Sequence, residues 1–176
     1  EVTVQMVANY RAGGAAINAI ARSNGLMLDI VPLALETPTS DISVGPAMTP
    51  AETLAAFQAG WNALQSGTDI LIAGEMGIAN TTVAAALAAR ACGGDGAMWA
   101  GAGTGLDAAG VARKAAVITR ALERHGNVPR TAFATLAALG GRELAAMAGA
   151  ILHARHARIP VLIDGFVVTA ALATLW

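Results

Sequence analysis

Two short apolar runs give the chain its clearest pattern, and a glycine directly follows each of them. They cover residues 68–73 (TDILIA) and residues 159–164 (IPVLID). Short apolar runs of this kind are typical of parallel strands that are buried on both faces. A third run, residues 26–35 (LMLDIVPLAL), is also interpreted as a strand, with Pro32 at its centre displacing it toward a sheet edge or a strand end.

Between these runs, apolar residues recur at the spacing of helices, and several segments carry start signals. Residues 49–52 (TPAE) combine a Thr N-cap, a proline at the first helical position and an acid in the first turn. Asp107 is a second candidate N-cap, and the hydroxyl residues Thr81 and Thr82 provide a third. The predicted helices cover residues 2–11, 15–22, 49–65, 81–90, 107–125, 131–139, 142–155 and 166–176.

Strands that alternate with Ala-rich helices, with glycine at the strand ends, predict an α/β fold. Such a chain forms a parallel sheet covered by helices on both faces, a Rossmann-like, three-layer arrangement. The 176 residues are enough for one domain with a substantial core, so we expect residues 1–176 to form a single α/β core domain. Because the chain stops within the apolar helical run 166–176, we expect it to be a fragment of a longer architecture.

Composition excludes several classes of partner. The net charge is −1 and the basic residues are scattered, which argues against nucleic-acid binding through a basic surface. Although the mean hydropathy is +0.55, no apolar stretch of about 18 residues is free of charges and helix breakers, so we expect no membrane-spanning helix. Cys92 is the single cysteine, which excludes a disulfide framework and a thiolate metal cluster and favours a cytoplasmic setting.

Acidic residues beside glycine mark the ends of both apolar runs. Glu75 lies in residues 74–77 (GEMG), and Asp164 is followed by glycine. If the two strands are neighbours, both carboxylates face one crevice at the carboxyl edge of the sheet, where open α/β folds bind ligands. Glycine loops before helix N-termini favour phosphate, and carboxylates suit ribose hydroxyls, metal ions or proton transfer. Together with a second glycine-rich turn, residues 101–107 (GAGTGLD), these features predict a phosphorylated-sugar site.

Plainer interpretations of the same residues stay open at this point. Residues 74–80 match neither the Walker nor the dinucleotide fingerprint and are equally consistent with a simple strand-to-helix turn. Asp164 is equally suited to cap a helix. Lys114 lies two turns into a predicted helix, and its position alone favours a solvated side chain over a phosphate ligand.

Other kinds of catalytic site find little support in the residue pattern. His125, His153 and His156 lack the spacing of a metal site. The chain has no nucleophile elbow and no convincing pairing of Cys92 with a histidine, so nucleophilic hydrolysis is not supported.

Longer motifs resemble one enzyme family. The strongest are residues 74–82 (GEMGIANTT), 103–107 (GTGLD) with Arg113 and Lys114, 139–141 (LGG) and 159–166 (IPVLIDGF), with further likeness in residues 9–18 (NYRAGGAAIN) and 46–49 (PAMT). In this order they resemble the nicotinate-nucleotide–dimethylbenzimidazole phosphoribosyltransferase family of cobalamin biosynthesis. The resemblance covers nearly the whole chain.

The resemblance implies a glycosyltransferase that moves phosphoribose from nicotinate mononucleotide to 5,6-dimethylbenzimidazole and gives α-ribazole 5'-phosphate and nicotinate. It implies no metal ion and no other cofactor, small-molecule substrates as the partners, and a homodimer in the cytoplasm. It also implies that the family's smaller helical domain is largely missing from this chain.

The resemblance further assigns roles to residues at matching positions. Glu75 is the catalytic candidate and, with Gly77, contacts the nucleotide near its ribose and phosphate, while Lys114 neutralises the phosphate. Gln5 is the candidate for the benzimidazole pocket. The full set of predicted substrate-binding residues is Gln5, Glu75, Met76, Gly77, Asn80, Thr81, Thr82, Gly103, Gly105, Lys114, Asp164 and Gly165.

Two departures from the family pattern shape the expectation for activity. The glutamate regarded as the family's general base lies beyond the segment that matches Trp176, and Ala102 stands where relatives often carry a basic residue. We therefore expect a binding-competent core with weak or no turnover by itself. Two further hypotheses are a non-catalytic protein that binds phosphoribosyl nucleotides and an inactive fragment that associates through its apolar end.

Overall fold

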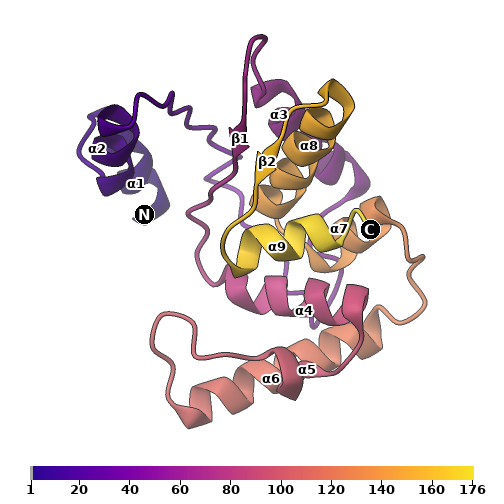
Figure 1. Ribbon diagram of the computed structural model, residues 1–176. Coiled ribbons are helices and arrows are strands. Elements are labelled where there is room, and N and C mark those ends of the chain that lie inside the picture. The colour runs from indigo at the N-terminus through magenta and orange to yellow at the C-terminus, as the bar shows by residue number, and fades with distance from the viewer. Residues whose placement is uncertain (1) are drawn as a thin grey trace.

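The computed structural model describes residues 2–176, and within them helices alternate with one small parallel sheet (Figure 1). The helices in order are α1 (Val2–Arg11), α2 (Ala16–Ser23), α3 (Pro50–Ala63), α4 (Asn80–Cys92), α5 (Gly96–Trp99), α6 (Ala108–Arg124), α7 (Ala132–Leu139), α8 (Arg142–Ala157) and α9 (Phe166–Ala173). None of them combines the length and the apolar character that crossing a membrane requires.

The two strands are β1 (Leu71–Ile72) and β2 (Val161–Leu162), and they pair in parallel. Leu71 is opposite Val161 and Ile72 is opposite Leu162, and the Leu71 N–H donates to the Pro160 carbonyl at 3.0 Å. The two apolar runs are parallel strands, as their pattern predicts, and the structure shows that they are neighbours, which the sequence left open. The α/β class is confirmed, although the sheet has only two strands within the described residues. The arrangement with a full layer of helices on each face stays a prediction.

The expectation of a third strand at residues 26–35 is wrong. This segment has no strand partner within residues 2–176, and its Ala34 adopts a left-handed backbone with φ of 49°. An extended segment becomes a strand only when a neighbour accepts and donates its backbone hydrogen bonds, and Pro32 cannot donate one. The paired strands are also less buried than predicted, since Ile72 is 53% and Leu162 49% exposed.

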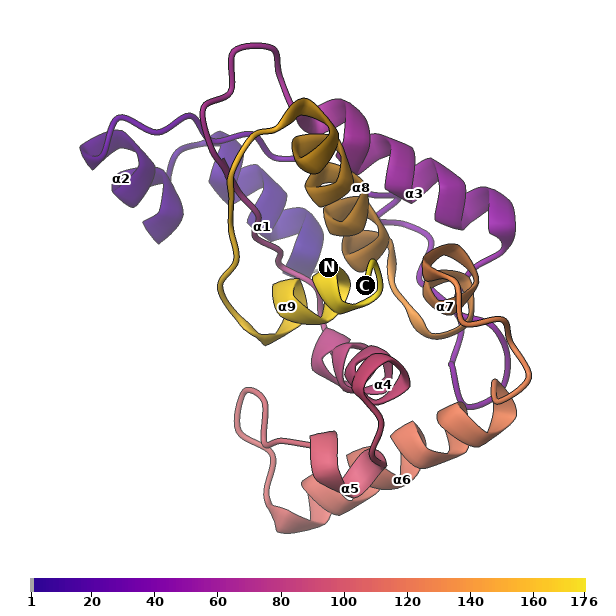
Figure 2. The same cartoon turned by 45° about the vertical axis from the view of Figure 1, so that its right-hand side comes forward.

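Helix α4 is the centre of the packing. In Figures 1 and 2 it lies between α9 and α6, and it contacts both of them. Its residues from Ala84 to Arg90 are all buried, with Leu87 as the largest fully enclosed side chain. A helix that is apolar on all sides has to be covered on all sides, and its alanines allow the neighbouring helices to approach closely. This burial fixes the N-terminus of α4 beside the carboxyl ends of the strands.

Helices α3 and α8 form the other close pair. Thr49 caps α3 as predicted: its hydroxyl accepts from the Glu52 N–H at 3.2 Å, while the Glu52 carboxylate accepts from the Thr49 N–H at 2.9 Å. Arg142, at the start of α8, donates to the same carboxylate at 2.6 Å and so ties the two helix starts together. Along the contact, a Cβ added at Gly60 would lie 1.7 Å from the Ala146 carbonyl oxygen, so the backbones touch there.

The close contact of α3 with α8 predicts a large effect for Gly60→Ala. The added methyl group has no space beside the Ala146 backbone, so the helices must separate, which costs about 1–3 kcal/mol of unfolding free energy or more. This loss exceeds the gain of about 1 kcal/mol that alanine brings to a helix interior. Urea unfolding monitored by circular dichroism measures the difference.

Gly45→Ala is the matched control, because nothing lies within 4 Å of its added Cβ. Its unfolding midpoint is expected to stay close to that of the wild type. Equal midpoints for Gly60→Ala and the wild type would contradict the close backbone contact.

Candidate functional site

The parallel pairing of β1 and β2 brings two strand-to-helix loops to the same edge of the sheet. Residues 73–79 lead from β1 into α4, and residues 163–165 lead from β2 into α9. Helices α4 and α9 pack against each other directly after these loops (Figure 1). Glu75 and Asp164 therefore follow neighbouring strands at one carboxyl edge, where ligands of α/β folds bind.

Both helices begin at this edge without a side-chain cap. Helix α4 starts at Asn80 after Ala79, which adopts a left-handed backbone with φ of 62°, and helix α9 starts after Gly165 with φ of 83°. The first-turn N–H groups of uncapped helices, with the positive end of the helix dipole, favour an anion. The predicted caps are wrong here, because Thr81 and Thr82 lie inside the first turn and Asp164 precedes the N-cap residue of α9.

Strain accompanies the start of α4. A left-handed backbone costs a residue with a Cβ roughly 1–2 kcal/mol, and Ala79 adopts one without glycine's freedom. Such strain is often found at functional sites, where the surrounding structure enforces it.

Lys114 of α6 reaches this helix start from the other side. Its side chain is buried, with 7% of the residue exposed, and its ammonium donates to the Thr81 hydroxyl at 2.8 Å and to the Gly101 carbonyl at 3.2 Å. The interpretation of Lys114 as a solvated side chain is therefore wrong. The helix places it inward, on the face that packs against α4.

The charge of Lys114 is not balanced by a carboxylate within residues 2–176. Burial removes water from the ammonium and lowers the pKa of Lys114 below its ordinary value. A buried cation that has only a hydroxyl and a carbonyl as partners suits a bound anion.

The second glycine-rich turn closes over the same pair of side chains. A Cβ added at Gly103, whose φ is +56°, would lie 3.3 Å from the Thr81 hydroxyl oxygen and 3.8 Å from the Lys114 nitrogen. Gly105 also has a positive φ of +127°. Asp107 then caps α6 as predicted, accepting from the Gly110 N–H at 2.7 Å. Residues 101–107 and the start of α4, distant in sequence, thus form one region.

Glu75 is held in place by two donors. Its Oε2 atom accepts from the Gly77 N–H at 2.6 Å and from the Asn80 side-chain amide at 2.5 Å. Asn80 is buried, whereas the side chain of Met76, which follows Glu75, is exposed. The loop thus presents a fixed carboxylate at the strand edge.

Sequence reasoning missed Glu143, which lies beside the Asn80 side-chain amide. It lies in the first turn of α8, and its carboxyl group approaches Gly77 and the Asn80 side chain. Burial raises the pKa of Glu143, and the nearby charge of Glu75 adds to this effect, while the hydrogen bonds from its own backbone N–H and from Asn80 oppose it. An acid two residues after the Gly140-Gly141 pair repeats the glycine–carboxylate pattern of the strand ends, and this signal could have identified it.

Two predicted residues are not gathered with the others. Gln5 is exposed on α1, a helix with no buried residue, which stands apart with α2 in Figure 1. Asp164 is at the correct edge but exposed, and its side chain forms no hydrogen bond within the described residues. Thr82 is half-buried, and its N–H donates to the Ala79 carbonyl at 3.3 Å, which stabilises the first turn of α4.

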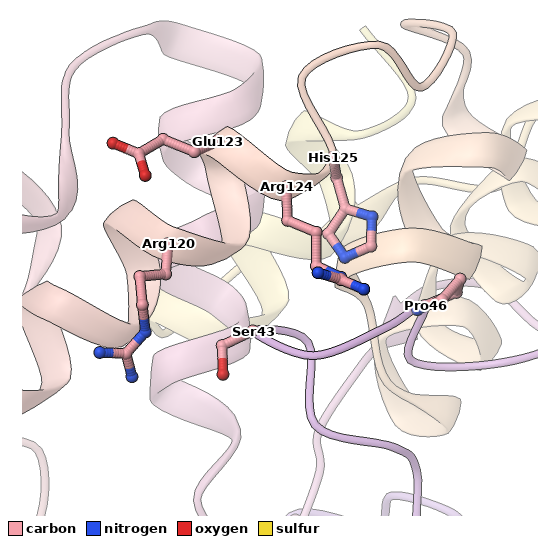
Figure 3. Close-up of a pocket in the computed structure, with 6 residues that line it drawn as sticks. All are labelled: Ser43, Pro46, Arg120, Glu123, Arg124 and His125. Carbon is pink, nitrogen blue, oxygen red and sulfur yellow. The ribbon is translucent and has the colours of Figure 1, made fainter.

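A separate hollow lies at the far end of α6 (Figure 3). It has a volume of about 620 Å³ and is lined by Ser43, Pro46, Arg120, Glu123, Arg124 and His125. His125 is buried there and bonds the Ile42 and Gly45 carbonyls at 3.0 and 3.2 Å, so it anchors the loop before α3. The strand-edge site is the stronger candidate because a buried ammonium, a hydrogen-bonded carboxylate and two uncapped helix starts converge there.

Comparison with known proteins decides the family. A family model described as phosphoribosyltransferase matches residues 1–176. The chain is 54% identical over 174 residues to the nicotinate-nucleotide–dimethylbenzimidazole phosphoribosyltransferase of Novosphingobium aromaticivorans, covering 99% of this chain and 52% of that protein. The chain belongs to the nicotinate-nucleotide–dimethylbenzimidazole phosphoribosyltransferase family.

Further relatives agree with this assignment. The enzyme of the same name from Rhodobacter capsulatus is 54% identical over 176 residues, which is 100% of this chain and 52% of that protein. The crystal structure of CobT from Thermus thermophilus superposes with a TM-score of 0.91 at 38% identity and covers 100% of this chain and 58% of that one. This chain therefore spans about half the length of the curated relatives that it matches.

The unbalanced charge of Lys114 predicts that Lys114→Met stabilises the fold at neutral pH. The variant removes a buried cation, so its free energy of unfolding should exceed that of the wild type, by roughly 1 kcal/mol or more. Because the pKa of Lys114 is lower in the folded than in the unfolded chain, the unfolded state binds more protons as pH rises through the folded pKa. The unfolding free energy of the wild type therefore increases as pH rises from the folded pKa toward the ordinary lysine pKa. Over this range the wild type approaches the stability of Lys114→Met.

Urea unfolding at a series of pH values measures this difference. Lys114→Arg keeps the charge and serves as the control, and it should show no gain in stability. A Lys114→Met variant that is less stable than the wild type at every pH would contradict an unbalanced buried charge.

Proposed function

We propose that this chain provides the nucleotide-binding core for transfer of phosphoribose from nicotinate mononucleotide to 5,6-dimethylbenzimidazole. The relatives from Novosphingobium and Rhodobacter carry the name of this activity, and they match the chain over nearly its whole length. The observation that carries the proposal within the chain is the buried ammonium of Lys114, held at the start of α4 beside the glycine turn. The products are α-ribazole 5'-phosphate and nicotinate.

In this proposal the phosphate of the nucleotide binds between Lys114, the first turn of α4 and residues 101–105. The three elements supply an ammonium, free helix N–H groups and a backbone that glycine lets approach closely. Gly103 and Gly105 form the wall of this pocket. The Thr81 hydroxyl accepts a hydrogen bond from the Lys114 ammonium and holds it in position before the ligand binds.

The ribose then lies toward Glu75, at the carboxyl edge of the strands. In the reaction the bond from ribose C1' to the pyridinium nitrogen breaks, and its electron pair goes to nicotinate, which leaves as a neutral ring. Positive charge develops on the ribose, and a fixed carboxylate nearby stabilises it. A nitrogen of the benzimidazole forms the new bond to C1', and its N–H proton passes to a base.

We assign Glu75 to charge stabilisation and ribose binding rather than to accepting that proton. Its Oε2 atom already accepts two hydrogen bonds, from Gly77 and Asn80. These bonds occupy this oxygen and fix the carboxylate beside the proposed position of the ribose. This arrangement also favours a second candidate function, namely binding of the nucleotide without transfer. Gly165 and Asp164 complete the edge on the side of α9, while Gln5 keeps its predicted role at the acceptor base.

A cytoplasmic homodimer is part of the proposal. The homodimer is supported by the apolar side chains left exposed on α2 and on the strands, among them Ile17, Ile20, Ile72 and Leu162.

Calorimetric titration with nicotinate mononucleotide tests the nucleotide site. Glu75→Ala removes the acceptor of the Gly77 N–H and of the Asn80 amide, so the loop loses its fixed shape and the ribose its partner. We expect the variant to lose at least about tenfold in affinity, about 1.4 kcal/mol. Addition of 5,6-dimethylbenzimidazole, followed by detection of nicotinate, separates transfer from binding alone.

Glu123→Ala is the matched control, since this glutamate is exposed at the far end of α6. It should bind the nucleotide as the wild type does. Equal affinity of Glu75→Ala and the wild type would contradict the placement of the ribose at this loop.

The phosphate pocket is tested separately with inorganic phosphate. Phosphate should raise the thermal unfolding midpoint of the wild type, because a ligand that binds only the folded state stabilises it. Lys114→Met should lose most of this shift, whereas Arg120→Met, on the exposed far part of α6, should keep it. An equal shift in both variants would contradict the assignment of Lys114 to phosphate.

A further inference from the structure

The carboxyl group of Glu143 lies in a cradle of two glycines that are distant in sequence. A Cβ added at Gly77, in the loop after β1, would lie 2.7 Å from Glu143 Oε1. A Cβ added at Gly141, the N-cap residue of α8, would lie 3.0 Å from Glu143 Oε2. Glycine at both positions lets the loop after β1 and the start of α8 approach this carboxyl group closely.

One amide links this carboxyl group to Glu75. The buried Asn80 donates to Glu75 Oε2 at 2.5 Å, and its amide also lies beside Glu143, since the Cβ position of Gly77 is 2.5 Å from the Asn80 nitrogen and 2.7 Å from Glu143 Oε1. An asparagine amide has two N–H bonds, which is enough to serve both carboxyl groups at once.

The charged groups around Glu143 leave it without a cationic partner. Arg142 is adjacent in sequence, but its guanidinium donates to the Thr37 carbonyl at 2.6 Å and to Glu52 at 2.6 Å. The loop after β1 contributes the negative Glu75, α4 contributes the neutral Asn80, and α8 contributes the backbone N–H of Glu143 itself. Burial and the neighbouring charge of Glu75 therefore both disfavour the ionised form of Glu143.

We propose that Glu143 is a positioning residue which, in its protonated form, holds Asn80 and through it the carboxylate of Glu75 at the ribose edge. Loss of the proton from Glu143 places a second negative charge beside Glu75 and draws the Asn80 amide away from it. The loop of residues 74–79 then loses its fixed shape. This deepens the proposed function and rests on it only for the identity of the ligand.

The proton on Glu143 is tested first without any ligand. Carbon-13 NMR of the side-chain carboxyl groups follows the titration of Glu143 and Glu75, and the amide of Gly77 reports the shape of the loop. We expect Glu143 to titrate above the ordinary range of a glutamate side chain, and the Gly77 amide to shift in the same pH range. A Glu143 that titrates in the ordinary range would overturn the proposal, and this outcome needs no variant.

Glu143→Gln then distinguishes the effect of ionisation from the effect of side-chain size. Glutamine has the size of the protonated side chain but cannot ionise, so the Gly77 amide should lose its pH response while its shift remains that of the protonated wild type. An unchanged pH response in Glu143→Gln would overturn the proposal. Glu123→Gln is the matched control, in which the response should persist.

Titration with nicotinate mononucleotide across the same pH range gives the functional consequence. Wild-type affinity should fall by roughly tenfold relative to Glu143→Gln at the same pH once Glu143 ionises, as expected for the loss of a hydrogen bond to a charged group. Comparison at equal pH cancels the titration of the ligand's own phosphate. Parallel pH dependence in the two proteins would overturn the link from Glu143 to the site. A chain that binds no nucleotide at all would contradict the proposed function, while the NMR titration still decides the role of Glu143.

Discussion

The burial of α4 on every side is the constraint on which the rest of the structure depends. Its alanines leave no room for water and little for side-chain adjustment, so α6 and α9 must lie directly against it. The helix start at Asn80 is therefore fixed with respect to both the strand edge and Lys114. A site whose groups come from three distant segments needs such a rigid reference, because small displacements weaken oriented electrostatic interactions.

Opposite charges are arranged on the two sides of this helix start. Lys114 and the free N–H groups form a positive region toward α6, and Glu75 and Asp164 form a negative region toward the strands. The proposed phosphorylated ribose fits this polarity, with its anionic group at one end and the centre of developing positive charge at the other. The charges stay apart because Thr81 binds the ammonium while Asn80, its neighbour in α4, binds the Glu75 carboxylate. The first two residues of one helix thus separate the two halves of the site.

The structural match to CobT from Thermus thermophilus shows that the overall arrangement of this chain is shared with that relative. Over this chain the likeness extends through α1 and α2, which stand apart from the packed helices, as well as through the core. The half-exposed strands and α1 carry exposed apolar side chains. The chain spans about half the length of the relatives that it matches. The part from α3 to α9 contains the residues of the proposed nucleotide site, and Gln5 lies outside it.

The sequence by itself determined the local features. The caps at Thr49 and Asp107, the parallel pair of strands and the glycine loops followed from residue types and spacing, because each depends on a few neighbouring residues. The long motifs determined the family. Tertiary structure alone decided the burial of Lys114, the lack of a partner for residues 26–35 and the link from Glu143 through Asn80 to Glu75. These outcomes depend on which segments meet in space. A helical position or an apolar run is compatible with several neighbours, and only packing selects which of them removes water from a charge or pairs with a strand.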